Sequence, residues 1–192
     1  MINEQTFKVL NAIYLRKMAN MEALAECSGL DIETARPLVE EAVASGLLID
    51  LGGQYMLQED GTRAVLEFYD QTYSDERKNQ DLVSWYDRFE LINTQFLKLV
   101  SEWQSEQGGD EATLGRLTRV VERLIKALPQ AVGFIPRYQV YADRFAAALA
   151  RVDQGDHSYV SSPTTDSVHN VWFEFHEDIL AVLGKPRDTV ES

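Results

Sequence analysis

Hydrophobic side chains recur with a helical period along most of this 192-residue chain, and one repeat is stronger than the others. Over residues 81–104, large apolar side chains alternate at steps of three and four, which gives an unbroken seam of three heptads. The seam consists of Leu82, Trp85, Phe89, Ile92, Phe96, Leu99 and Trp103. Its many aromatic side chains predict a long helix in a bundle core or at a subunit interface.

Weaker apolar stripes predict further helices on both sides of this seam. We expect helices at roughly 4–18, 111–128, 136–152 and 166–183, with loops at 129–135 and 155–163. Asn3 is the expected N-cap of the first helix, and Thr164 or Thr165 that of the last. Another helix follows Asp60-Gly61-Thr62, and the polar run 74–80 is a solvated helix or a linker.

Residues 21–61 combine two short helical stretches with two short strands. The first helix ends in a turn at Ser28-Gly29, and the second has its apolar face at Leu38, Val39, Ala42 and Val43. Apolar runs at 47–51 and 54–58 flank Gly52-Gly53, a two-residue hairpin signal. Helix, turn, helix and hairpin is the layout of a winged helix. The stretch resembles the winged-helix domains of MarR-type bacterial regulators, with Gly-Gly-Gln-Tyr-Met-Leu at 52–57 as the wing.

The predicted fold is therefore mainly α-helical and has two parts. Residues 1–62 form a winged-helix domain, 63–80 a connecting helix or linker, and 81–192 an all-helical bundle domain. Strand is expected only in the hairpin near 47–58.

Composition narrows the setting in which the chain works. The net charge is −13, and a strongly acidic protein is repelled by phosphate backbones unless its basic residues gather on one face. The single cysteine, Cys27, excludes an internal disulfide and fits a reducing compartment. No signal peptide and no membrane-length apolar run is present, so we expect a cytoplasmic location and no membrane contact.

The charge of residues 1–61 argues against DNA recognition by the winged helix. Four basic side chains face ten acidic ones, a balance of −6, and the 54–58 strand of the wing has no Lys or Arg. The second helix of the motif has one base, Arg36, followed by Pro37, which requires the helix to start late, near Thr34, or to kink. Ser28, Thr34 and Arg36 are the candidate DNA contacts, but a protein-binding winged helix is the favoured interpretation.

Basic residues gather on two of the predicted helices of the C-terminal part. They are Arg116, Arg119, Arg123 and Lys126 on one helix, and Arg137, Arg144 and Arg151 on the next. The first four lie at i, i+3, i+7 and i+10, which is one helix face. The functional interpretation is a docking face for an acidic partner or a phosphate-bearing ligand. The alternative is a solvated face, or pairing with Asp81, Asp87 and Glu90.

The histidines do not predict a metal site. His169 and His176 are seven residues apart, about 10.5 Å along a helix, too far to chelate one ion. Histidines packed beside Trp172 and Phe173 in a core or interface are the favoured interpretation. His176-Glu177 is similar to the His-Glu pair of sensor kinases, although Leu180 stands where a polar residue is expected. The sequence offers no phosphate-binding loop, no metal-ligand cluster and no catalytic constellation, and we expect no cofactor.

The last helix contains the motif Trp-Phe-Glu-Phe-His-Glu-Asp at 172–178. It is similar to the C-terminal stretch of a bacterial family whose members join a MarR-like winged helix to a helical domain. The long helix with Trp85-Tyr86 and Trp103-Gln104 is similar to that family too. The resemblance implies a transcription regulator by fold. Some members accompany phosphoenolpyruvate-utilising phosphotransferases, and the resemblance to them implies that this protein is an accessory subunit of such an enzyme.

Three functions follow in order of preference. The first is a non-catalytic regulatory or accessory protein that acts through protein partners, including a second copy of itself. The second is a dimeric winged-helix transcription regulator. The third is an enzyme with a phosphohistidine at His176.

Overall fold

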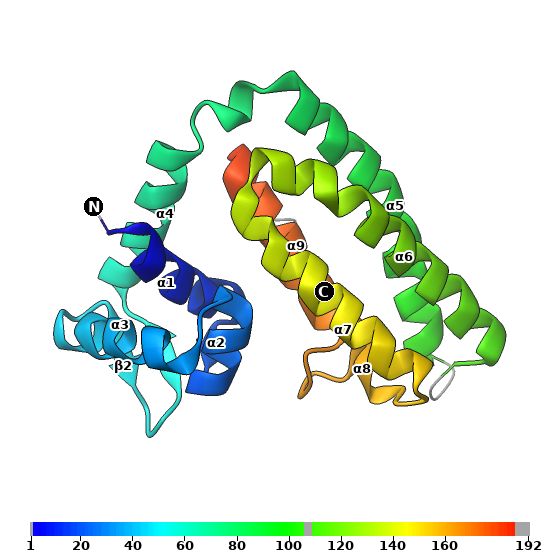
Figure 1. The fold of residues 1–192 in the computed structure, drawn as a ribbon, viewed down its shortest axis with the longest axis horizontal. Coiled ribbons are helices and arrows are strands. Elements are labelled where there is room, and N and C mark those ends of the chain that lie inside the picture. The colour runs from blue at the N-terminus through cyan, green and yellow to red at the C-terminus, as the bar shows by residue number, and fades with distance from the viewer. Residues whose placement is uncertain (1, 106–108, 187–192) are drawn as a thin grey trace. The chain divides into compact units, whose positions relative to one another are not determined.

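A computed structural model describes residues 2–105 and 109–186, and these residues form nine α-helices, two 3-10 turns and three strands (Figure 1). The protein is mainly helical, as predicted. Its chain divides into two compact units, Met1–Arg77 with Leu180–Ser192, and Lys78–Ile179. The predicted helical domain of 81–192 therefore differs at its end, because the last turn of the final helix belongs to the first unit.

The first unit begins with α1 (Glu4–Arg16), β1 (Met18–Ala19), α2 (Met21–Ser28) and α3 (Ile32–Ala44), and continues with β2 (Leu48–Asp50), β3 (Tyr55–Leu57) and α4 (Glu59–Thr72). Side-chain caps fix the helix starts. The Asn3 carboxamide accepts the Thr6 N–H at 2.9 Å, as predicted, and the Asp31 carboxylate accepts the Thr34 N–H at 2.8 Å. Because Asp31 caps α3, the helix starts at Ile32, and the predicted later start near Thr34 is wrong. Pro37 lies inside the continuous helix.

The three strands form one antiparallel sheet in the order β1-β3-β2. Strand was predicted only in the β2–β3 hairpin, so β1 is an addition. It forms because Lys17 takes a left-handed φ of 72° and ends α1, which turns Met18 and Ala19 alongside β3. Two residues are too few to produce an alternating pattern that the sequence could reveal.

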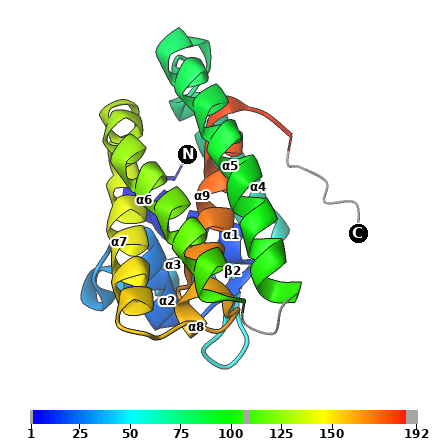
Figure 2. The same cartoon turned by 90° about the vertical axis from the view of Figure 1, so that its right-hand side faces the viewer.

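The second unit contains α5 (Gln80–Ser105), α6 (Glu111–Phe134), α7 (Gln139–Asp153), the single turn α8 (Ser158–Ser161) and most of α9 (Val168–Leu183). A 3-10 turn, Glu76–Lys78, precedes α5, and another, Pro136–Tyr138, precedes α7. All seven seam residues of α5 are buried within this chain. In Figure 2, α9 lies between α5 and α7, and rings from both helices pack on Trp172 of α9.

Two helix boundaries of this unit differ from the prediction. The segment 129–135 was expected to be a loop, but α6 continues through Pro129 to Phe134. Pro129 lies on the exposed side, while Leu128 and Ala131 extend the buried stripe, so burial outweighs the backbone hydrogen bond that proline cannot make. The last helix begins at Val168, and the hydroxyl of Ser167, rather than Thr164 or Thr165, accepts the Asn170 N–H.

Candidate functional site

The four predicted cations of α6 are exposed along one face of the helix. Arg116 makes an ion pair with Glu102 of α5, with an N–O distance of 2.9 Å. Arg119 donates to the Gly115 carbonyl, and Arg123 donates to the amide oxygen of Gln95. Within residues 2–105 and 109–186, Arg119, Arg123 and Lys126 have no carboxylate partner, so pairing with Asp81, Asp87 or Glu90 does not explain them.

Side-chain contacts join α5 and α6 at regular steps. Arg88 donates to Gln130 at 3.1 Å, Arg123 to Gln95 at 2.7 Å, and Arg116 to Glu102 at 2.9 Å. Each contact is seven residues from the next on both helices, which is the spacing of side chains that face one partner helix. This register holds Arg116 and Arg123 of α6 against α5.

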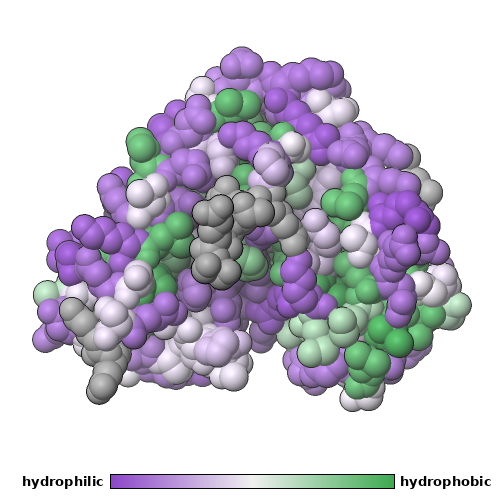
Figure 3. All heavy atoms as spheres, turned by 180° about the vertical axis from the view of Figure 1, so that it is seen from behind, coloured by the Kyte–Doolittle hydropathy of each residue, from purple (hydrophilic) through white to green (hydrophobic). Residues whose placement is uncertain are grey.

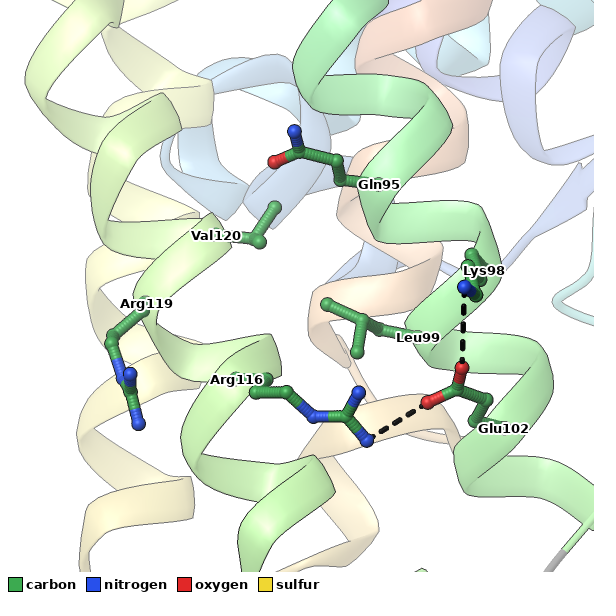
Figure 4. Close-up of a pocket in the computed structure, with 7 residues that line it drawn as sticks. All are labelled: Gln95, Lys98, Leu99, Glu102, Arg116, Arg119 and Val120. Atoms are coloured by element: carbon green, nitrogen blue, oxygen red, sulfur yellow. Dashed lines mark hydrogen bonds and ion pairs between the residues drawn. The ribbon is translucent and has the colours of Figure 1, made fainter.

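A groove of about 320 Å³ opens between these two helices. The buried side chains of Leu99 and Val120 point into the space between the helices (Figure 4). Lys98, Gln95 and Glu102 line its α5 side, and Arg116 and Arg119 its α6 side. Three cations against one carboxylate give the groove a positive charge over an apolar floor.

The α5 side of this groove was not among the predicted site residues. A signal for it existed, since the polar residues 88, 95 and 102 repeat at the same seven-residue step as 116, 123 and 130. The sequence could not show that the two series face each other, because that depends on how the helices pair.

The basic residues of the α6–α7 connection and of α7 do not belong to this face. Arg137, in the turn before α7, makes a bidentate ion pair with Asp178, and Arg144 pairs with Asp166 and Glu174. Both arginines are less than one-tenth exposed, so their assignment to a docking face is wrong. Arg151 remains exposed, and its guanidinium lies over the Tyr159 ring.

The motif at 172–178 forms much of the core of the second unit. Trp172 stacks on Phe96 and donates its indole N–H to Asn93, and Phe175 packs edge-on against the ring of Phe89. Glu174 and Asp178 are the buried partners of the two arginines, and the hydroxyl of Tyr141 also donates to Asp178. Every one of these side chains has a structural contact that accounts for it.

His169 and His176 are partly buried beside aromatic rings, but these rings belong to Phe96 and Phe89 of α5, whereas Phe173, expected beside them, is 48% exposed. His176 is 12% exposed, with Nε2 3.1 Å from a carboxylate oxygen of Glu90 and its ring 5.6 Å from that of Phe89. Burial beside Phe96 lowers the pKa of His169. The low exposure of His176 counts against a phosphohistidine at this position. Within the described ranges, no group of three His, Cys, Asp or Glu side chains could hold a metal ion.

In a DNA-binding winged helix, α3 would enter the DNA groove, and the exposed charged side chains of α3 are mainly acidic. Of the three candidate DNA contacts, Arg36 is exposed, Thr34 is half-buried and Ser28 is buried. Ser28 is buried, with its hydroxyl bonded to the Ala25 carbonyl, and the Thr34 hydroxyl donates to Asp31. The exposed neighbours of Arg36 on α3 are Pro37 and the acids Glu33, Glu40 and Glu41. Partial burial raises the pKa of the nearby Tyr55, and the charge of Asp50 adds to the effect.

The sheet carries an apolar row on its outer face. The strand register places Met18, Met56 and Ile49 side by side across all three strands. Their exposed fractions are 48%, 38% and 40%, and Leu51, two residues beyond Ile49, is 52% exposed. Ala19 and Leu48 occupy the opposite, buried face. Figure 3 shows hydrophobic side chains gathered over the hairpin end of this unit.

Comparisons with protein-family models, with curated proteins and with solved structures found no match for the chain. Among the helices at 2–105 and 109–186, none has both the length and the apolar content that a membrane crossing requires.

Proposed function

We propose that this is a non-catalytic regulatory or accessory protein, and that its residues 1–62 are a winged helix that binds a protein rather than DNA. The observation that carries this proposal is the outer row of the sheet, formed by Met18, Ile49 and Met56 and extended by Leu51. We name these four residues the sheet row.

An antiparallel sheet with one face on the core usually has polar side chains on the other. Here the outward-facing residues of one sheet face, Met18, Ile49 and Met56, are all apolar, and Met is the side chain that adapts most readily to a partner surface. A contiguous apolar patch of this kind is typical of a protein interface. It offers nothing to the phosphate backbone of DNA.

The second candidate is a dimeric winged-helix transcription regulator. The order of α2, α3 and the hairpin favours it, and Arg36 is exposed where a base contact would be made. The exposed acids of α3 oppose it, because each phosphate contact needs a cation or a neutral donor.

The resemblance of the 172–178 motif supplies the first partner to test. We propose a phosphoenolpyruvate-utilising phosphotransferase as that partner, with this chain as its accessory subunit. The protein would then supply contacts and no catalytic group.

The test compares Met56→Glu with Gln54→Glu, since both add one acid to the hairpin but only Met56 lies in the sheet row. A purified phosphotransferase from the same cell should bind the wild type and Gln54→Glu equally in calorimetry, and Met56→Glu at least about tenfold more weakly, because a charge would be buried unpaired. Equal binding of all three forms would remove the sheet row from the interface.

The DNA alternative is tested with the wild type and with Arg36→Ala. A gel-shift screen of the protein's own promoter at about 0.1 M salt should give no sequence-dependent complex, since specific binders reach about 10⁻⁸ M or better at physiological salt. Tight, sequence-dependent binding that is lost in Arg36→Ala would establish the regulator instead.

A further inference from the structure

We infer that the groove between α5 and α6 binds an acidic amphipathic helix of a protein partner. This inference rests on the proposed function, because it gives the partner a second contact, in the Lys78–Ile179 unit. It is carried by the charges, dimensions and floor of the groove.

Charge complementarity specifies the chemistry of the occupant. Arg119, Arg123 and Lys126 have no carboxylate partner within the described ranges, although the protein has an excess of 13 negative charges. These three cations are therefore complementary to a partner whose surface supplies carboxylates.

The length of the cationic face favours a helix over a small anion. Arg116 and Lys126 are ten residues apart, which is about 15 Å along α6. One phosphate group spans only a fraction of that distance. A partner helix with carboxylates at i, i+3, i+7 and i+10 has the same rise between charges and could contact the whole row.

The floor of the groove adds an apolar requirement. Leu99 and Val120 point into the space between the helices (Figure 4), and Arg116 and Arg119 line the same groove. Apolar anchors along one edge of a helix, docked in a groove between two others, are a common form of peptide recognition. The occupant is therefore amphipathic, with apolar side chains beside its acidic row.

Glu102 limits binding at one end of the groove. It pairs with Arg116 at 2.9 Å and lies 4.0 Å from Lys98, so it occupies two cations that the partner could use. Removing its charge should free both of them.

The probe is a synthetic helical peptide with Glu at i, i+3, i+7 and i+10, and Leu at i+4 and i+8. Two control peptides replace either the four Glu or the two Leu with Gln. We expect calorimetry to detect binding of the acidic peptide to the full-length protein, and each control peptide to bind at least about tenfold more weakly. Inorganic tripolyphosphate, measured in parallel, should bind more weakly than the acidic peptide.

Protein variants then locate the contact. Arg119→Glu with Arg123→Glu should weaken peptide binding by at least about tenfold, because like charges would face each other, whereas Arg63→Glu in the first unit should leave it unchanged. Glu102→Gln should strengthen binding severalfold. Glu67→Gln makes the same change in net charge on an exposed α4 residue and should have no effect beyond screened long-range attraction.

Absence of peptide binding, or equal affinity of the wild type and the Arg119→Glu, Arg123→Glu double variant, would overturn the inference. Tighter binding of tripolyphosphate would replace the helix with a small polyanion and overturn it too. The sheet row plays no part in the peptide assay. If the peptide does not bind but the phosphotransferase complex still depends on Met56, only the inference about the groove is refuted. If the peptide binds but the phosphotransferase complex does not depend on Met56, only the proposed function is refuted.

Discussion

The indole N–H of Trp172 donates a 2.9 Å hydrogen bond to the side-chain oxygen of Asn93 inside the second unit. Both side chains are almost fully buried, so neither group has water as an alternative partner. A polar residue on the buried face of α5 is thereby explained by one residue of α9. This hydrogen bond links the 172–178 motif of α9 to α5, the helix with the strongest apolar repeat.

Asn93→Leu should destabilise the protein by about 1–3 kcal/mol, because the Trp172 N–H would stay buried without an acceptor. Urea denaturation followed by tryptophan fluorescence measures the change. Thr94→Ala, at the adjacent exposed position, should change stability by no more than about 0.5 kcal/mol. Equal stabilities of Asn93→Leu and the wild type would mean that the indole finds another acceptor.

Phe96→Ala should cost about 3–5 kcal/mol, because the ring is fully buried and stacks on Trp172 at 3.8 Å. Leu97→Ala removes an apolar side chain from the next position, which is 52% exposed, and should cost far less. Thermal melts of the two variants provide the comparison. Similar melting temperatures would place Phe96 outside the core.

Asp178→Asn should destabilise the protein by about 3–5 kcal/mol, since the charge of Arg137 would remain buried without its carboxylate. Asp87→Asn removes one negative charge from an exposed position of α5 and serves as the control. Chemical denaturation at pH 7 compares the two. If Asp178→Asn left the free energy of unfolding unchanged, water would have to reach Arg137.

The stability of the protein should fall in mild acid partly because of His169. Burial lowers the pKa of this histidine below the value of about 6.5 that an unfolded chain gives it. The unfolded state therefore binds the proton at higher pH than the folded state. The stabilising effect of neutral His169 is fully present above about pH 6.5 and is lost as the pH falls below that value.

His169→Gln should accordingly show a shallower loss of stability between pH 7 and 5 than the wild type, because glutamine binds no proton in this range. The measurement is urea denaturation at a series of pH values. Identical slopes for His169→Gln and the wild type would contradict the lowered pKa.

Local features of this protein were determined by the sequence alone. The seam of α5, the Asn3 cap and the hairpin glycines at 52–53 depend on side-chain period and backbone preference within a few residues. The placement of Arg116, Arg119, Arg123 and Lys126 on one helix face followed from the same short-range pattern. Each of these properties is fixed within one element.

Tertiary structure decided which elements meet. A basic residue at a regular helical spacing can face solvent or a buried acid. Arg137 and Arg144 have their partners 41 and 22 residues away along the chain, where no local pattern could indicate them. The continuation of α6 past Pro129 and the pairing of β1 likewise depend on surfaces supplied by distant segments. Hydrophobic periodicity predicts that a helix face is buried, but it does not identify the segment that packs on that face. Tertiary packing determines that segment, because long-range contacts supply the free energy that selects among locally acceptable structures.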